Sequence, residues 1–398
     1  MPPATPGRAY DFAFAGAGAA GLCLAVQLHR AFPDARLLLI DPGFADTDAK
    51  TYAFWSDRTP PFEAELERTW SSVRLATAQE VVVRPLHRYR YHVLRGAVFR
   101  RAATRELAAG GRTELLAARV RSVRDDGEVR TERGTVRPLW TFDSRLRPDR
   151  VPADRHGHVA LTQRFLGWDV RCDRDALDEA TVTLMDFRTP QGRGDVRFLY
   201  VLPFDRRRAL VEHVALHPND EAEAIRAYLE DVLGVDRFTI ERRESGSTPL
   251  TDVPFPRRTG RRILTLGIAG GRVKPSSGYA FTRIWEDGEA IVRSLATCGH
   301  PFALPAERQA YRFLDALLLR VLRHRPGAAP EIFLRMFARS PPDRVLALLD
   351  ARAHLHEVLR LGLGLPAGPF LEAACREGAG WLRAAVARLT APVPYDEE

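Results

Sequence analysis

The opening forty residues alternate two short apolar runs with one helical stripe of apolar side chains. The runs are residues 11–15 and 36–40. The stripe between them consists of Leu22, Ala25, Val26 and Leu28. A run that is apolar at nearly every position is typical of a parallel strand buried on both faces, whereas the stripe has helical spacing. Pro33 follows the stripe and ends such a helix. The pattern therefore predicts a strand-helix-strand unit at the start of the chain.

After this unit, strands and polar turns predominate. Residues 42–57 are polar and irregular, and their aromatic end, at Tyr52, Phe54 and Trp55, is interpreted as packing beneath a loop. The pattern then predicts a short helix over 63–69, strands over 73–91, a helix over 99–109 and a strand meander between 113 and 143.

A second group of strands occupies the middle of the chain. Expected strands cover 158–170, 181–188, 196–204, 209–216 and 238–248, with one helix over 220–233. These runs predict a mainly antiparallel domain inserted into the first one. A buried strand at 262–267 and a helix from 279 to about 295 return the chain to the first domain.

The last hundred residues are expected to be amphipathic helices that are unusually apolar. The most apolar segments are 313–322, 332–337 and 358–365. One interpretation is a helical cap over the core, and the other is a surface that docks on a membrane and admits a lipidic substrate. The two interpretations are compatible.

Together these patterns predict an α/β fold with three parts. Residues 1–150 and 250–300 form a discontinuous Rossmann-like nucleotide-binding domain, residues 151–249 a β-sheet substrate domain, and residues 301–398 the helical cap with its possible membrane contact.

Composition narrows the function classes. The chain has 398 residues, a formal charge of +8 and an isoelectric point near 9.7, but all its basic residues except Lys50 and Lys274 are arginines scattered along the sequence. Nucleic acid is therefore not an expected partner. The four cysteines are far apart and the histidine pairs have i,i+2 spacing, so we expect no metal site and a reducing cytoplasm. No window is apolar enough to span a bilayer.

The turn of the opening unit carries the most specific motif. Gly16, Gly18 and Gly21 give G-x-G-x-x-G at the point where the helix must begin, and Asp41 ends the second strand 20 residues later. Such glycines allow a tight turn, a close approach to a pyrophosphate and close helix-strand packing, while the acid binds a ribose hydroxyl. We therefore predict one bound dinucleotide.

Two further elements are expected to contact the same dinucleotide. The glycine-rich segment that contains Gly267 and Gly278 precedes a helix and supplies more N–H donors. The backbone of Val120 could contact an adenine ring, or could serve the strand alone.

Glu212 and Asp186 are the candidate catalytic acids. Strand alternation puts Leu210, Glu212 and Val214 on one face, and a carboxyl group among apolar neighbours has a raised pKa and stays protonated. An ion pair with one of Arg206 to Arg208 fits the sequence equally. For Asp186 the alternative is a pair with Arg188 on the same strand face.

The chain resembles the bacterial lycopene β-cyclases, a group of FAD proteins with an N-terminal G-x-G-x-x-G. The resemblance covers most of the chain in order. The segments that carry it are 10–22, 37–41, 140–145, 165–170, 184–188, 198–204, 209–214, 246–252 and 267–284. Three of these features are specific to this family. They are the last segment, the sequence LMDFR at 184–188, and the spacing between YVLP at 200–203 and LVE at 210–212.

The resemblance implies a bound FAD whose reduced form is active, NADPH or another reductant, and conversion of the linear ends of lycopene to β-ionone rings without net redox change. The essential acid of the family falls on Glu212. The family often has a second acid, or a Tyr/Thr pair, after this position, where this chain has His213-Val214, so we expect no proton relay there.

This chemistry needs an apolar tunnel, a protonated acid and aromatic faces near a carbocation. The candidate aromatic residues are Phe187, Tyr200, Phe204, Tyr279 and Phe281. The expected location is the cytoplasm, at the inner face of the membrane. The alternative function is an FAD-dependent monooxygenase or reductase that acts on an apolar isoprenoid.

Overall fold

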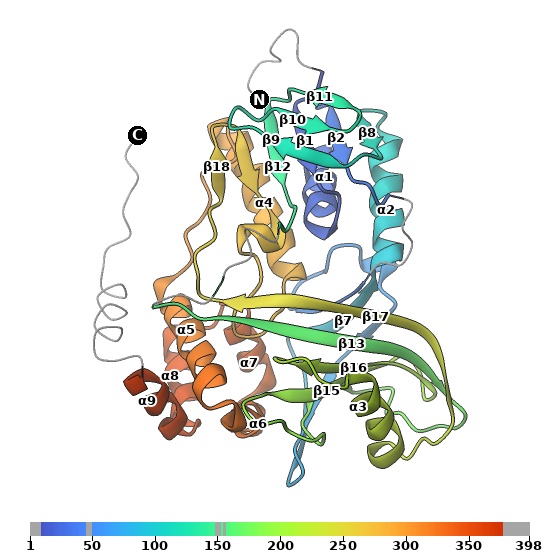
Figure 1. Ribbon diagram of the computed structural model, residues 1–398, viewed down its shortest axis with the longest axis vertical. Helices are drawn as coiled ribbons and strands as arrows, with labels where there is room; N and C mark the ends of the chain where they lie inside the picture. The colour runs from blue at the N-terminus through green and yellow to red at the C-terminus, as the bar shows by residue number, and fades with distance from the viewer. Residues whose placement is uncertain (1–8, 45–49, 148–152, 154–156, 377–398) are drawn as a thin grey trace.

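The computed structural model describes residues 9–44, 50–147, 153 and 157–376. It has two lobes, and several segments of the chain pass between them (Figure 1). The upper lobe contains the opening strand-helix-strand unit, and the lower lobe contains the long strands and the C-terminal helices. The α/β fold with a Rossmann-like part, an antiparallel sheet and a helical C-terminal region is confirmed.

The upper lobe is a three-layered Rossmann-like unit. Its six-stranded sheet has the order β18-β19-β12-β1-β2-β8, and only the pairing of β18 with β19 is antiparallel. The strands are β1 (Phe12–Ala15), β2 (Leu37–Ile40), β8 (Thr113–Leu116), β12 (Trp140–Asp143), β18 (Arg258–Gly260) and β19 (Ile263–Thr265).

Both faces of this sheet are covered, because its central strands are apolar at successive positions. The face with Phe14 and Leu39 packs against α1 (Ala19–Ala31), α2 (Gly96–Ala109) and α4 (Phe281–Cys298). The face with Ala13 and Leu38 packs against a small antiparallel sheet of β9 (Val120–Val123), β10 (Val129–Thr131) and β11 (Gly134–Val136). The predicted meander is thus shorter than expected, since its outer segments form β8 and β12 of the parallel sheet.

The lower lobe is a seven-stranded sheet of order β17-β13-β16-β15-β14-β5-β6. Its strands are β5 (Ser72–Ala76), β6 (Val81–Pro85), β13 (Ala160–Cys172), β14 (Val182–Asp186), β15 (Arg197–Pro203), β16 (Arg208–Ala215) and β17 (Phe238–Thr251). All pairings are antiparallel except that of β14 with β5. Two strands of this sheet, β5 and β6, thus come from before residue 151.

Two layers flank the seven-stranded sheet. One face packs against α3 (Glu221–Ala227) and the π-helical turn η3 (Tyr228–Val232). The other face packs against a three-stranded sheet of order β3-β7-β4 and against C-terminal helices. The strands of this smaller sheet are β3 (Thr51–Ser56), β4 (Arg68–Trp70) and β7 (Arg90–Arg95).

Two local predictions were wrong here. The aromatic group Tyr52, Phe54 and Trp55 lies in β3, because pairing with the distant strand β7 satisfies its backbone. Residues 63–69 form only the 3-10 turn η1 (Glu63–Glu65) before β4 begins.

The C-terminal region is helical in its described part, which ends at residue 376. It contains α5 (Gln309–His324), the turn η5 (Pro326–Ala328), α6 (Ala329–Arg339), α7 (Pro342–Leu349), α8 (Leu355–Leu363) and α9 (Ala367–Arg376). Buried residues of α6, α7, α8 and α9 belong to the same apolar cluster as β5, β7, β15 and β16. Among the described residues, no helix combines the length and apolar character that a membrane span requires.

Gly16 and Gly21 let β1 and α1 pack closely. Gly16 has a φ of +101°, a conformation that glycine adopts without a steric penalty. A Cβ atom on Gly21 would overlap the carbonyl oxygen of Gly16, whereas one on Gly18 would meet no atom within 4 Å. Only two of the three motif glycines are therefore required by packing within the protein.

Gly21→Ala is expected to destabilise the protein. Overpacking costs about 1–3 kcal/mol, which exceeds the gain of at most about 1 kcal/mol from replacing a helical glycine. Thermal unfolding should show a midpoint several degrees lower. Gly327→Ala, at a remote glycine whose Cβ atom would meet nothing within 4 Å, is the control and should unfold like the wild type. A Gly21→Ala variant as stable as the wild type would contradict this packing.

Candidate active site

The N-terminus of α1 forms the candidate dinucleotide site. The N-cap is Gly18, whose position receives no side-chain capping bond. The first turn of α1 contains no acidic residue, so its N–H groups and positive dipole end remain suited to a phosphate. The open space beside Gly18 lies at this helix end. These features fit the pyrophosphate of a dinucleotide.

Asp41 and Gly267 lie at the same end of α1. One oxygen of Asp41 (Oδ2) accepts the backbone N–H of Ala17 at 2.9 Å, and the other (Oδ1) accepts that of Gly43 at 2.8 Å. Gly267 begins η4 (Gly267–Gly270), and a Cβ atom on it would lie 2.7 Å from the Cβ atom of Ala20. The structure thus brings the two glycine-rich segments together. The carbonyl oxygen of Val120 accepts a bond from Arg145 at 3.3 Å, and contact with an adenine ring stays a prediction.

Gly278 belongs to a turn that positions a tyrosine. Gly278 has a φ of +75°, and its N–H donates to the carbonyl oxygen of Lys274 at 2.8 Å. The N–H of Lys274 in turn donates to the carbonyl oxygen of Tyr279 at 2.9 Å. The turn places the Tyr279 hydroxyl 2.5 Å from that of Tyr91, which is 2.7 Å from that of Tyr200. The three hydroxyl groups come from separate elements and form one cluster.

Glu212 lies beside this tyrosine cluster. It pairs with Tyr200 across β15 and β16. Its neighbours on the same strand face, Leu210 and Val214, belong to the large apolar cluster of the lower lobe. Burial, reinforced by the nearby carboxylate of Glu244, raises the pKa of Glu212 well above its usual value. Both effects favour the protonated form of Glu212.

The alternative ion pair for Glu212 does not form. Arg206 and Arg207 pair with Asp175, and Arg208 pairs with Asp205. Of the two interpretations of Glu212, the structure supports the neutral acid.

Glu244 was missed by sequence reasoning. It lies on β17, in a charged segment (Glu241-Arg-Arg-Glu-Ser245) that is typical of a solvated strand, yet its side chain is only 5% exposed. The Glu244 carboxylate accepts bonds from the side chain of Arg242 at 2.8 Å and from the N–H of Thr51 at 2.9 Å. A glycine inside a long strand, Gly167, was the available signal, because such a glycine often marks close approach of neighbouring groups.

Asp186 is held on the other face of the sheet. Its carboxylate receives two bonds from the guanidinium of Arg188, at 2.9 and 2.6 Å, one from the backbone N–H of Arg188 at 3.1 Å and one from the hydroxyl of Tyr228 at 2.8 Å. Tyr228 belongs to the cluster under α3, whereas Glu212 faces the opposite layer. The ion-pair interpretation of Asp186 therefore fits the geometry, and the structure does not bring the two candidate acids together.

His213 also points away from Glu212, since successive residues of a strand face opposite sides. Its ring is buried, and this burial, with Arg197 nearby, lowers its pKa to about 4. His213 is thus neutral at physiological pH, in line with the expectation that no proton relay runs through this position.

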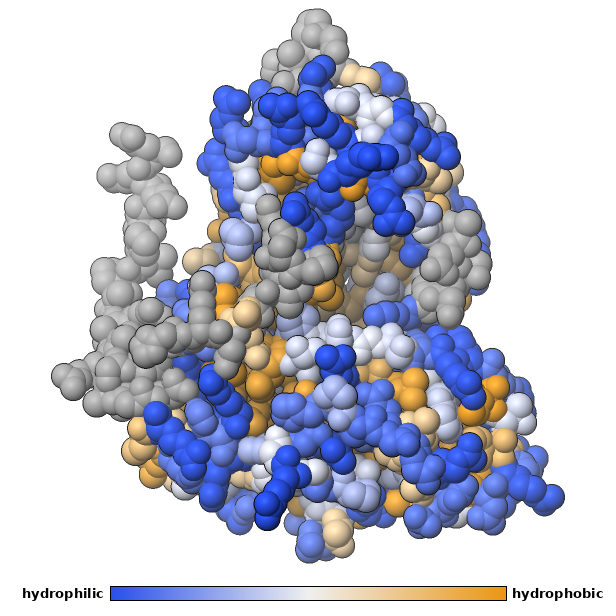
Figure 2. Space-filling view, in the orientation of Figure 1, coloured by the Kyte–Doolittle hydropathy of each residue, from blue (hydrophilic) through white to orange (hydrophobic). Residues whose placement is uncertain are grey.

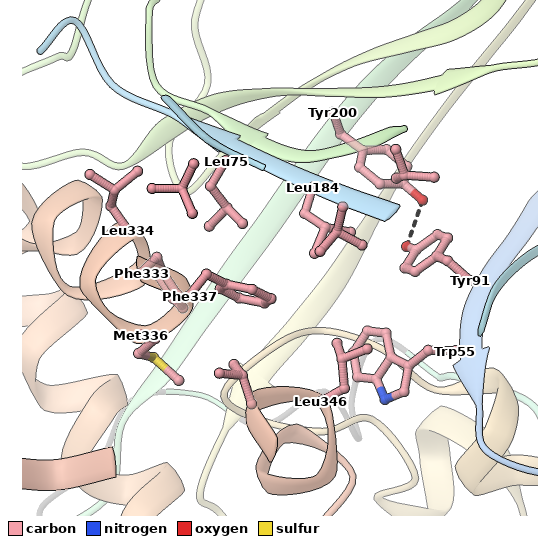
Figure 3. Packing of buried hydrophobic residues seen from close by; sticks show 14 of the residues in the cluster. Trp55, Leu75, Tyr91, Leu184, Tyr200, Phe333, Leu334, Met336, Phe337 and Leu346 are labelled. Carbon is pink, nitrogen blue, oxygen red and sulfur yellow. Dashed lines mark hydrogen bonds between the residues drawn. The ribbon is translucent and has the colours of Figure 1, made fainter. Parts of the chain in front are cut away.

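Aromatic and apolar side chains extend from the tyrosine cluster to the C-terminal helices. Figure 3 shows Tyr200 and Tyr91 at one end, Trp55 near Tyr91, and Phe333 and Phe337 of α6 at the other. The ring centroids of Trp55 and Tyr279 are 4.4 Å apart. Among the other candidate aromatic residues, Phe187 and Phe204 belong to this cluster, whereas Phe281 packs on Tyr52 and Phe54 in the upper lobe.

A separate cavity of about 990 Å³ lies between the η4 segment, α4 and α5. Its walls are rich in charged groups, many of which are paired, such as Arg257 with Asp287 and Lys274 with Asp315. Neither Glu212 nor Gly18 lines it. Walls of this kind do not suit an apolar substrate. Within the described residues, no group of three or more metal-ligating side chains is arranged for a metal ion.

Comparison of the fold with solved structures gives distant matches that cover nearly the whole chain. A geranylgeranyl bacteriochlorophyll reductase-like protein from Thermoplasma acidophilum has a TM-score of 0.58 at 12% identity, with 95% of this chain and 99% of that chain covered. The probable FAD-dependent monooxygenase PqsL from Pseudomonas aeruginosa has a TM-score of 0.54 at 16% identity, covering 89% and 99%. A flavin-dependent halogenase from Xanthomonas campestris has a TM-score of 0.58 at 13% identity, covering 96% and 99%. At these identities the matches establish the fold alone.

Sequence comparison is more specific. A lycopene beta-cyclase from Paracoccus sp. (strain N81106 / MBIC 01143) is 26% identical over 393 residues, which cover 90% of this chain and 95% of the relative. The family described as "Lycopene cyclase protein" matches residues 11–375. The chain is therefore a member of the lycopene cyclase family of enzymes.

Proposed function

We propose that this enzyme is a lycopene β-cyclase that converts the linear ends of lycopene to β-ionone rings, giving γ- or β-carotene, by acid-base chemistry without net redox change. The observation that carries the proposal is the position of the Glu212 carboxyl group beside three tyrosine hydroxyl groups in an apolar layer, where burial raises its pKa. Membership of the family and the related β-cyclase support the substrate class.

The apolar layer supports a hydrocarbon substrate. Lycopene has no polar group, so its site must exclude water and offer apolar walls. The cluster around Tyr91, Tyr200 and Trp55 continues through Phe337 to buried residues of the last helices, such as Leu361. A long substrate that follows this cluster would place one end beside Glu212.

The residues of the site suit proton transfer to an alkene. Glu212 donates its proton to the end alkene, a tertiary carbocation forms, ring closure moves the charge, and loss of a ring proton restores neutrality. Tyr200, Tyr279 and Trp55 offer π faces that stabilise the cation. The Glu212 carboxylate left by the first step is a base that can recover the proton, so no electron acceptor is needed.

FAD is the proposed resident dinucleotide, bound by the N-terminus of α1 with Asp41 at the ribose and the Gly267 segment at its far end. The open space at Gly18 and the contact of Gly267 with Ala20 fit this placement. When bound and reduced, FAD supplies an electron-rich, negatively charged surface that stabilises a cation. NADPH or another reductant is proposed as its electron source.

We also propose that the enzyme works at the inner face of the cytoplasmic membrane. Leu355, Leu359 and Leu363 recur every four residues on α8 and are 66%, 62% and 87% exposed, and Leu371 on α9 is 64% exposed. Such a stripe is typical of an interaction surface. The same two helices contribute Leu361 and Ala373 to the cluster that leads to Glu212, which would connect a lipid surface with the site.

Figure 2 shows the hollow between the two lobes on one face, with hydrophobic residues along it.

A flavin monooxygenase or reductase for an apolar isoprenoid is the competing function, because the same fold houses such enzymes. Those enzymes consume one nicotinamide per product. The cyclase should instead form rings with no matching nicotinamide oxidation once the flavin is reduced, and stoichiometric oxidation would support the competitor.

Glu212→Gln should abolish cyclisation in cells that accumulate lycopene. An amide keeps the shape of the side chain but cannot deliver the proton, so we expect a loss of about a hundredfold or more. Chromatography of the pigments measures the result. Glu241→Gln, an exposed change on β17, is the matched control and should leave the products unchanged. Full conversion by Glu212→Gln would refute the assignment.

Gly18→Val should lower flavin content without unfolding the protein. Its side chain would enter the open space at the start of α1, where the pyrophosphate is proposed to lie. Absorbance of the purified protein measures bound flavin, and thermal unfolding checks the fold. Gly327→Val serves as a remote control, because Gly327 has no positive φ and its Cβ atom would also meet nothing within 4 Å. An unchanged flavin content in Gly18→Val would argue against this placement.

Replacing Leu355, Leu359 and Leu363 together by Gln should weaken membrane binding at least tenfold. Each leucine contributes on the order of 1–2 kcal/mol when lipid buries it. Co-sedimentation with vesicles of phosphatidylglycerol and phosphatidylcholine measures the effect. Val81→Thr with Val83→Thr, at valines that are each 46% exposed on β6, is the control. Equal vesicle binding by the wild type and the leucine variant would exclude α8 as the docking surface.

A further inference from the structure

Glu212 and Glu244 face one another across a glycine. In the strand register, Gly167 of β13 pairs with Glu212 of β16 on one side and with Glu244 of β17 on the other. Strands that are two apart in a sheet lie roughly 10 Å from each other. The two side chains can therefore meet only by extending over the strand between them. A side chain at position 167 would block that approach.

The space above Gly167 is occupied by Glu212 itself. A Cβ atom on Gly167 would lie 2.8 Å from Cγ and 2.9 Å from Oε1 of Glu212. The Glu212 side chain thus lies over Gly167 on the way to Glu244, and the nearby Glu244 carboxylate adds to burial in raising the pKa of Glu212. Because Gly167 has no side chain, the two carboxyl groups have room to approach each other over strand β13.

Glu244 is held as the ionised member of the pair. Its Oε2 accepts bonds from Arg242 Nη1 at 2.8 Å, Thr51 N at 2.9 Å and Thr51 Oγ1 at 3.1 Å. Burial acts to raise the pKa of Glu244, but the hydrogen bonds from Glu212, Arg242 and Thr51 outweigh it and lower the pKa. Donors aimed at a carboxylate oxygen fix both its charge and its position.

The arginines near the pair are bound by other carboxylates. Arg242 pairs with Glu244 and Asp169, and Arg95 pairs with Asp169 and Glu67. The remaining titratable groups that face Glu212 are Tyr91, Tyr200 and Tyr279, which are neutral because burial raises the pKa of each. These surroundings favour one negative charge and one proton on the pair.

We propose that Glu212 and Glu244 act as one carboxyl pair that holds a single proton above Gly167. Glu212 is the member that touches the substrate, and Glu244 is the positioning residue that orients the Glu212 acid and favours return of its proton. This inference rests on the proposed function and deepens it.

The proton that leaves Glu212 returns to it at the end of the reaction. The O–H bond of Glu212 breaks as a C–H bond forms at the end alkene, and the ring C–C bond then forms. A ring C–H bond breaks, and its proton returns to Glu212. While the substrate carries the proton, Glu212 and Glu244 are both anions, and repulsion between like charges makes Glu212 a stronger base. The same two charges stabilise the cation.

The test compares pH-rate profiles of the purified, flavin-loaded enzyme acting on lycopene in vesicles. Glu244→Gln removes the negative charge that helps to keep Glu212 protonated. Its activity should therefore be lost at a pH about one unit lower than in the wild type, with kcat reduced roughly tenfold and KM little changed. Glu244→Asp keeps the charge and should restore the wild-type profile in large part. Glu241→Gln is the control on the same strand.

Gly167→Ala tests the meeting point independently. The added methyl group separates the carboxyl groups, so kcat and the high-pH limit should fall as they do in Glu244→Gln. Flavin content and thermal unfolding monitor the fold of each variant. If Glu244→Gln and Gly167→Ala keep the wild-type pH profile, the paired-carboxyl inference is wrong even though the enzyme cyclises lycopene. Lack of cyclisation by the wild type would instead refute the proposed function.

Discussion

The cost of burying a charged carboxyl group is the constraint on which this account depends. Moving an ionised carboxylate from water into a protein interior costs several kcal/mol unless it is fully paired. Glu212 lies among tyrosine and aliphatic side chains, and the neighbouring arginines are already paired with other acids. Burial therefore raises the pKa of this carboxyl group and favours its protonated form. The same apolar layer also excludes water.

The fold satisfies this constraint by combining distant parts of the chain. The seven-stranded sheet supplies Glu212, Gly167 and Glu244 on adjacent strands, and the small sheet beside it supplies Thr51 and Tyr91. The turn that ends at Gly278 adds Tyr279 from the upper lobe, on a segment that begins at the N-terminus of α1. The segment from Gly267 to Tyr279 thus runs from the N-terminus of α1 to the tyrosine cluster.

Sequence patterns predicted the parts whose determinants are local. The opening unit follows from continuous apolar runs and a proline, and the face of Glu212 follows from strand alternation. The pattern failed where long-range pairing decides the outcome. Strand β3 forms by pairing with β7, and β5 and β6 join a sheet whose other strands begin at residue 160. Glu244 was missed because its segment is highly charged and because only the register across β13 brings it to Glu212.

The most direct measurement is an infrared spectrum of the purified protein at neutral pH, compared with that of Glu212→Gln. We expect the carbonyl band of a protonated carboxyl group in the wild type, and we expect it to disappear in the variant. The band should also persist as the pH is raised well beyond the usual range of a glutamate. A wild-type spectrum without a band that depends on Glu212 would contradict the central claim that this carboxyl group is kept protonated.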